Sequence, residues 1–280
     1  MTANRLRPRP TTPGLWAVAC VLTTLGLTAS CAQPGPDGQG DPSSVDSSSG
    51  GGAFRVHYEA ARTPEAQQMQ DALRRSRVVE DFVDTMNDFV RVPRDVAVTV
   101  KDCDEANAFY SEDDHSIELC HQLPLEEKQL LVASGTPEAE AQGLVEKSAE
   151  ATLFHEGGHA LIGELELATT GREEDVADQM SAYMLTADPD TAQDLRTVAE
   201  IYRLQSQRTT AIDDLPFYDI HSLDKQRMVN FLCYAYGAYP EDFGDIVGPE
   251  FLAEERAEGC PAEYASMSRA WDELLAPHRK

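Results

Sequence analysis

Two histidines four residues apart, with a glutamate directly after the first, are the residues of this chain best suited to chemistry. They lie in the apolar run ATLFHEGGHALI, residues 151–162. On a helix, positions i and i+4 lie one above the other, so His155 and His159 can present ring nitrogens to one Zn²⁺. Glu156 projects beside them, where its carboxylate can take a proton from water that the metal activates. We therefore expect one zinc ion per chain, with Glu156 as general base.

A catalytic zinc needs a third protein ligand, and the following sequence narrows the choice. The extension typical of metzincins would require Gly at 162 and His at 165, but the chain has Ile162 and Leu165. The next helix-like segment, GREEDVADQ at 171–179, carries Glu174 and Asp178 four residues apart. These two carboxylates therefore share one helical face.

This arrangement resembles the active site of gluzincins, the thermolysin-like zinc peptidases. The resemblance implies that Glu174 is the third zinc ligand, with Glu173 as an alternative. It further implies that Asp178 hydrogen-bonds a ligand histidine, His155, and fixes its tautomer.

A peptidase of this type also needs a His or Tyr donor for the oxyanion of its tetrahedral intermediate. His221, which lies between Asp219 and Asp224, is the first candidate for this catalytic role. Alternatively, His221 caps a helix that begins near Ser222. Other possible donors are Tyr183, Tyr218 and Tyr234.

The region from about Phe54 to the C-terminus also resembles a family of bacterial metallopeptidases of uncharacterised function. The residues that carry this resemblance are 107–110 (NAFY), 117–120 (IELC), 155–159, 171–175 with Asp178, and 221–227 (HSLDKQR). In zincins a strand edge ahead of the active helix pairs with an extended peptide, so the hairpin at 108–120 is a candidate substrate-binding edge. A structural hairpin held by a disulfide is the alternative.

The elements that must position these residues are mostly helical. Helical spacing of apolar residues predicts one long helix over 63–90, and β-branched alternation predicts a strand over 92–101. A hairpin is expected from 108–110 and 116–120. Later helices are expected at 137–164, 173–185, 191–207, 222–236 and 261–275. The predicted fold class is α+β, mostly helical and zincin-like, with a small N-terminal sheet, an active-site helix and a helical C-terminal lobe.

The N-terminus has the pattern of an export signal. Three arginines within the first nine residues precede the apolar stretch GLWAVACVLTTLGLTAS at 14–30. The stretch ends in LTASC, which is similar to the lipobox of bacterial lipoproteins and predicts lipidation of Cys31. Residues 31–52 are rich in Pro, Gly, Ser and Asp, which is typical of a flexible linker.

We therefore divide the chain into a signal (1–30), a linker (31–52) and a metallopeptidase domain (53–280). The expected location is the outer face of a bacterial cell membrane through the lipid anchor. Simple cleavage with release as a secreted protein is the alternative.

Four cysteines lie beyond the signal and the lipobox: Cys103, Cys120, Cys233 and Cys260. Export places them in an oxidising compartment and none forms a CxxC pair, so disulfides are favoured over a thiolate metal site. Of the three possible pairings, we expect the sequence-local one, which joins Cys103 to Cys120 and Cys233 to Cys260.

Charge limits the partners of this chain. The 23 Lys and Arg against 49 Asp and Glu give a net charge of −26. Nucleic-acid binding depends on clustered basic residues, so a nucleic-acid partner is not expected. Anionic headgroups are repelled too, so membrane contact should occur only through the N-terminal anchor. We expect a monomer whose partner is a peptide or protein substrate.

The predicted function is zinc-dependent hydrolysis of peptide bonds, with Glu156 as general base. One alternative is a zinc-binding lipoprotein without turnover that acts as a binding or assembly module. The other is a zinc hydrolase of a non-peptide substrate.

Overall fold

The structure, a computed structural model, describes residues 51–209 and 211–280. The predicted export signal, the lipidation site Cys31 and the linker as far as residue 50 lie outside the described residues. Within the described ranges, no helix is both long and apolar enough to cross a membrane.

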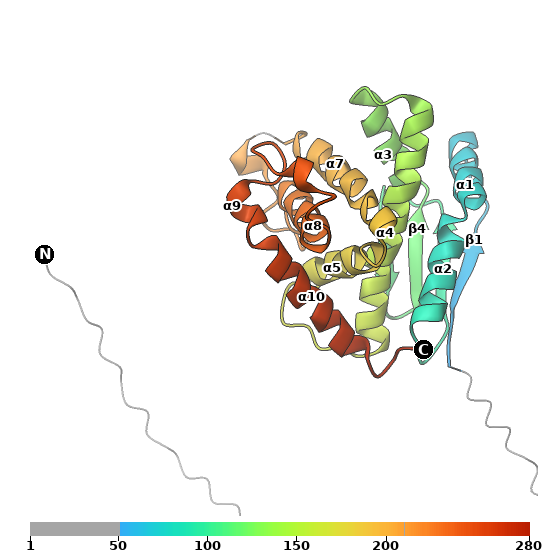
Figure 1. Cartoon of the computed structure of the whole chain (residues 1–280). Coiled ribbons are helices and arrows are strands. Elements are labelled where there is room, and N and C mark those ends of the chain that lie inside the picture. The colour runs from blue at the N-terminus through green and yellow to red at the C-terminus, as the bar shows by residue number, and fades with distance from the viewer. Residues whose placement is uncertain (1–50, 210) are drawn as a thin grey trace, which may run out of the picture. The chain divides into compact units, whose positions relative to one another are not determined.

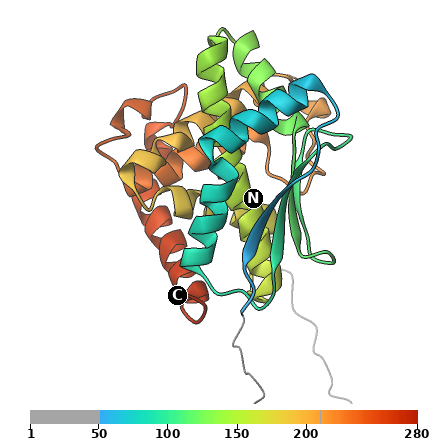
Figure 2. The same ribbon diagram turned by 90° about the vertical axis from the view of Figure 1, so that its right-hand side faces the viewer.

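A four-stranded sheet with strand order β1-β2-β4-β3 forms one side of the fold (Figures 1 and 2). The strands are β1 (Phe54–Tyr58), β2 (Val96–Lys101), β3 (Ala108–Ser111) and β4 (Ser116–Cys120). β1, β2 and β4 are parallel, and β3 pairs antiparallel to β4. The predicted hairpin is thereby confirmed, and β3 lies at the edge of the sheet.

Strand β1 was not predicted, because only its first residue, Phe54, is buried. A strand with one buried side chain lacks the alternation that identifies a half-buried strand. In β2, by contrast, Val96, Val98 and Val100 are fully buried and alternate with half-buried residues. β2 is shorter than the predicted strand over 92–101.

The long helix predicted over 63–90 is wrong in one respect, because the chain breaks it at Arg77. The two resulting helices are α1 (Pro64–Ser76) and α2 (Val78–Phe89). Arg77 has a φ of 62°, in the left-handed region. The break coincides with an interruption of the apolar face of the helix. After Leu73, the next positions on this face are the polar residues Ser76 and Arg77, and buried apolar residues resume at Val78.

Helix α4 (Glu138–Glu164) runs between the sheet with α1 and α2 on one side and the later helices on the other (Figure 1). It is preceded by α3 (Gln122–Ala133), which was not predicted. Proline is common both in turns and in the first turn of a helix, so Pro124 did not indicate that a helix begins here.

The C-terminal half is helical, as expected. Its elements are α5 (Glu173–Leu185), α6 (Pro189–Ala192), α7 (Asp194–Ser206), α8 (Asp224–Ala238), α9 (Glu254–Ala257) and α10 (Cys260–Leu275). The predicted helix over 191–207 is divided at Gln193. The chain end returns to α2, where the His278 carbonyl accepts a hydrogen bond from the Arg91 backbone N–H. The predicted α+β class, mostly helical with a small sheet, is confirmed.

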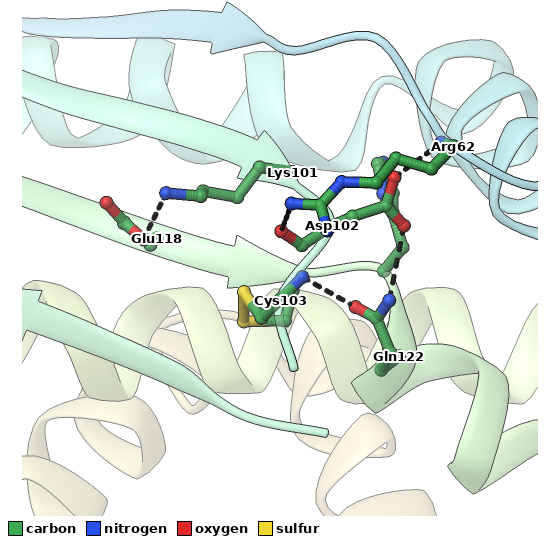
Figure 3. Close-up of a disulfide and its surroundings, with 8 residues drawn as sticks. Arg62, Lys101, Asp102, Cys103, Glu118 and Gln122 are labelled. Atoms are coloured by element: carbon green, nitrogen blue, oxygen red, sulfur yellow. Dashed lines mark hydrogen bonds and ion pairs between the residues drawn. A yellow bond between two sulfur atoms is a disulfide. The ribbon is translucent and has the colours of Figure 1, made fainter. Parts of the chain in front are cut away.

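Both expected cysteine pairings are present in the structure. Cys103–Cys120 joins the segment after β2 to the end of β4, and Cys233–Cys260 joins α8 to α10. Beside the first disulfide, the Gln122 side chain accepts a hydrogen bond from the Cys103 backbone N–H (Figure 3). It donates another to Asp102, 3.2 Å away. This network fixes the end of the sheet next to α3.

Glu164, the last residue of α4, fixes the β3–β4 hairpin against the helix. Its side chain is 1% exposed and lies 2.7 Å from both the Tyr110 hydroxyl and Nδ1 of His115. The Arg94 guanidinium lies 3.0 Å from its second oxygen. Because a Cβ at Gly163 would lie 3.1 Å from the Tyr110 ring, the strand and the helix are in close contact. β3 therefore lies beside the helix that carries the predicted site.

Candidate metal centre

Helix α4 presents the His-Glu-x-x-His sequence toward α5, and two glycines allow the close packing. A Cβ at Gly158 would lie 3.0 Å from Cβ of Met180 and 3.1 Å from Cα of Ala177. A Cβ at Gly157 would meet the ring of Phe82 at 3.1 Å on α2. Both glycines therefore occur where neighbouring helices approach α4 closely, which brings the first turn of α5 to the histidines.

Three imidazole nitrogens surround one carboxylate oxygen. Oε2 of Glu174 lies 3.2 Å from Nε2 of His155, 3.2 Å from Nε2 of His159 and 3.0 Å from Nε2 of His221. Donor atoms of His155, Glu174 and His221 all lie within 4.8 Å of one another. All three predicted ligands therefore meet at Glu174, but the group of donor atoms that lie within 4.8 Å of one another contains His221 and leaves out His159.

The opposite nitrogen of each ring is held by a carboxylate. Nδ1 of His155 lies 2.8 Å from Asp178, Nδ1 of His159 lies 2.8 Å from Glu173, and Nδ1 of His221 lies 3.1 Å from Asp219. Carboxylates that accept the Nδ1 proton fix the tautomer in which Nε2 is free to bind a metal. Glu173 is therefore placed behind His159, and Glu174 is the carboxylate among the Nε2 atoms.

Sequence reasoning gave no role to Arg227, which lies on α8. Its guanidinium donates to Asp178 at 2.6 and 2.8 Å and stacks over the Tyr202 ring, 4.3 Å from the ring centre. Asp178 is buried and Arg227 is largely so, with side chains 6% and 13% exposed. Arg227 therefore holds the carboxylate that holds His155.

A loop before α8 brings His221 to the other two histidines. Its backbone N–H donates to the Asp219 side chain at 2.8 Å. Helix α8 has Leu223 as its N-cap residue, so the alternative in which His221 caps the helix is not what the structure shows.

The tyrosines considered as oxyanion donors lie elsewhere. The Tyr183 hydroxyl donates to Asp272, and the Tyr234 hydroxyl accepts from Gln179. Tyr218 is 92% exposed and does not line the space beside the predicted ligands. Of the four donor candidates, His221 is therefore the one that adjoins the predicted ligands.

Comparison with known proteins adds one finding. A family model described as "Putative metallopeptidase" matches residues 58–275. The chain belongs to this family. No curated protein and no solved structure matches the chain. Membership supports metal-dependent hydrolysis as the general class of activity, and the matched segment contains every residue of the centre described above.

The charges of the centre fit a bound cation. Burial opposes a charge on His155, but hydrogen bonds to Asp178 and Glu174 raise its pKa to about 9. Burial likewise opposes the charge on Glu174, yet the three histidines hold its pKa far below the usual range. Carboxylates that favour positively charged imidazoles also favour a divalent metal in place of those protons. The donor set of imidazole nitrogens and a carboxylate suits such an ion.

Glu156 differs from the other carboxylates of the centre. It is 5% exposed, and burial raises its pKa above the ordinary glutamate value. A raised pKa brings a carboxylate closer to the range in which it can both accept and return a proton near neutral pH.

An open cleft leads to the centre. It has a volume of about 600 Å³ and is lined by Asn107 and residues 108–110 of the edge strand β3, together with His155, Glu156 and His159. The free edge of β3 thus borders the same space as the general base predicted from sequence.

Proposed function

We propose that this protein is a zinc-dependent peptidase. The observation that carries the proposal is the convergence of three Nε2 atoms on Oε2 of Glu174 beside the buried carboxylate of Glu156. In this proposal His155, His159 and Glu174 hold one zinc ion, and Asp178 orients His155. When bound there, zinc lowers the pKa of water to about 7 and polarises a carbonyl group.

The side chains of the chain carry the proton transfers. Glu156 takes a proton from the attacking water and returns it to the leaving amine. His221 acts in its protonated form, which Glu174 favours by raising the pKa of this histidine: Nδ1 donates to Asp219 and Nε2 donates to the developing oxyanion. The burial of Glu156 supports this role, because an exposed glutamate would stay ionised and return the proton poorly.

An extended peptide is the substrate that the cleft fits best. β3 pairs with β4 on one side, and its other side is the free edge of the sheet. A free strand edge can bind an extended chain through backbone hydrogen bonds. Because residues 107–110 and Glu156 line one cleft, a peptide paired with β3 passes the general base.

The sequence pattern of the N-terminus supports an exported protein that is lipidated at Cys31 and linked to its domain by residues 32–52. In bacteria that carry the full chain, mass spectrometry of the mature N-terminus should find acylated Cys31. An N-terminus that begins at Met1 would contradict this location.

The proposed function is tested by elemental analysis and casein turnover on the purified full chain, with Glu174→Ala and Glu156→Gln in parallel. We expect one zinc per chain in the wild type, loss of zinc in Glu174→Ala, and retained zinc in Glu156→Gln with turnover reduced by about 10²–10⁴-fold. Absence of zinc from the wild type, or full turnover by Glu156→Gln, would contradict the proposal.

One observation favours a second function, a zinc-binding module without turnover. Nε2 of His221 is as close to Glu174 as the nitrogens of His155 and His159 are. If His221 were a fourth ligand, the site would be closed, which is typical of structural zinc. Bound zinc without turnover of any peptide would favour this module.

A further inference from the structure

A second cavity leads from the candidate metal centre into the helical part of the fold. It has a volume of about 160 Å³ and shares His155, Glu156 and His221 with the open cleft. From there it extends between α3, α4, α7 and α8. A cavity of about 150 Å³ holds one benzene-sized group. The cavity is therefore suited to a single side chain of a molecule that occupies the cleft.

Apolar side chains form part of the walls of this cavity. They include Leu123, Val198, Ile201, Tyr202 and Phe231. Such walls bind the methylene groups of a long side chain.

Acidic groups outside the metal centre also line the cavity. Glu127 on α3 is 6% exposed, and Asp224 at the start of α8 is half-buried. The charges of Arg227 and Arg208 partly oppose the rise that burial causes in the pKa of Asp224, whereas Arg227, which hydrogen-bonds both oxygens of Asp178, is not among the charges that act on Glu127. Among the described residues no cation pairs with Glu127, which thus lines the cavity as a buried carboxylate beside the apolar side chains.

Glu127 is the more unusual of the two. Burial raises its pKa to about 7, the Ser148 hydroxyl partly offsets this effect, and the charged neighbour that acts on it is another acid, Glu126. The adjacent Lys128 pairs with Glu138 instead. A buried carboxylate without a cation avoids its charge by taking up a proton, so Glu127 becomes a charged partner only for a cation that enters the cavity.

We propose that this cavity is the specificity pocket of the peptidase and takes the lysine or arginine side chain of a substrate residue that flanks the scissile bond, with Glu127 as its ion partner. The inference rests on the proposed function and deepens it. The apolar walls contact the methylene stem, and the carboxylates of Glu127 and Asp224 receive the charged end. Entry of a cation favours the ionised form of Glu127.

The test uses the full chain loaded with zinc and a set of peptides that differ only at the two residues flanking the scissile bond. Each position carries Lys, Arg, Met or Glu in turn. At one of the two positions we expect kcat/KM for Lys or Arg to exceed that for Met, a side chain of similar length without charge, by at least about tenfold. Glu127→Gln should remove this preference, so that kcat/KM for the Lys or Arg peptide falls to about that for the Met peptide.

Glu126→Gln is the matched control. It removes the same charge from the neighbouring residue of α3, but the Glu126 side chain is 47% exposed, pairs with Arg208 and does not line the cavity. The Glu126→Gln variant should prefer Lys or Arg over Met to the same degree as the wild type. Equal loss of preference in both variants would assign the effect to the general negative charge of the region and overturn the pocket.

Binding provides a readout that does not depend on turnover. In the Glu156→Gln background, calorimetric titration should give a lower Kd for the Lys peptide than for the Met peptide, and Glu127→Gln should abolish the difference. If Glu127→Gln does not fold, the wild type alone decides: cleavage of the Met peptide as efficiently as the Lys and Arg peptides overturns this inference and leaves the proposed function standing. If the zinc-loaded protein cleaves no peptide, both the specificity pocket and the proposed function are wrong.

Discussion

Arg227 binds both carboxylate oxygens of Asp178, with Nη2 2.6 Å from Oδ1 and Nε 2.8 Å from Oδ2. Oδ1 also lies 2.8 Å from Nδ1 of His155. Burial opposes the charge of Asp178, but Arg227 and His155 outweigh it and lower the pKa of this carboxyl group. A residue of α8 therefore fixes the orientation of a histidine on α4.

Asp178→Asn should weaken metal binding. An amide has one oxygen where Asp178 has two, so it cannot serve both Arg227 and His155 as the carboxylate does. Loss of such an orienting partner typically lowers metal affinity about 10–100-fold. Competition with a chromophoric chelator measures this affinity. Asp88→Asn, the same change at an exposed position of α2, is the control and should leave it unchanged. Equal affinities in the two variants would contradict the role of Asp178.

Gly158→Ala should destabilise the protein although alanine is the better helix former. The new Cβ would lie 3.0 Å from Cβ of Met180 and 3.1 Å from Cα of Ala177, both on α5. Overpacking of this kind costs about 1–3 kcal/mol, which exceeds the gain of about 1 kcal/mol in helix propensity. Denaturant unfolding measures the free-energy difference.

Gly143→Ala is the matched control on the same helix. Nothing lies within 4 Å of a Cβ at Gly143, so this change should raise the free energy of unfolding by up to about 1 kcal/mol. Stabilisation of similar size in both variants would mean that α5 moves away easily, and the close packing of the two helices would then not be what positions Glu174.

His221→Ala should keep zinc and lose turnover. A catalytic zinc typically has three protein ligands and an open position, and in the proposed function His155, His159 and Glu174 supply the three. Removing a donor to the oxyanion lowers kcat by about 10²–10³-fold. Elemental analysis and kinetics on the same sample separate the two effects. Loss of zinc from His221→Ala would make His221 a ligand and favour the binding module over the peptidase.

The local part of the site could be predicted from the sequence because helical spacing determines it. His155 and His159 lie on one helix, and Glu174 and Asp178 lie on the next, so each pair shares a face whatever the rest of the fold does. The closeness of the two pairs was predictable only through the resemblance to gluzincins. The glycines between the histidines gave a second, physical indication of close packing.

Arg227 shows why the rest could not be predicted. Its carboxylate partner is 49 residues away, and no periodic pattern distinguishes a buried arginine from a solvated one. Glu127 is similar, because it lies in an unpredicted helix and its burial depends on α4 and α7. The break at Arg77 was missed for a different reason. Apolar residues at helical spacing continue before and after it, and the interruption between them is short.

His121 should make the protein less stable in mild acid. It is fully buried, with Nδ1 3.3 Å from Asp102, and burial lowers its pKa below the ordinary histidine value. Below about pH 6.5 the unfolded chain therefore binds a proton that the folded chain excludes, and stability falls as pH falls, by up to about 1.4 kcal/mol per pH unit. Asp102, whose pKa is also lowered, acts in the same direction but only below about pH 4.

Denaturant unfolding of wild type and His121→Gln between pH 7.5 and 5 measures this contribution, because the other titrating groups are common to both proteins and cancel in the difference. The stabilities should run parallel above about pH 6.5, and the wild type should lose stability faster below it. The slopes matter here, since glutamine also changes the contact with Gln70, which lies 3.2 Å from Nε2 of His121. Parallel curves down to pH 5 would mean that His121 is protonated in the folded protein as readily as in the unfolded chain, and that the Asp102 carboxylate compensates its burial in full.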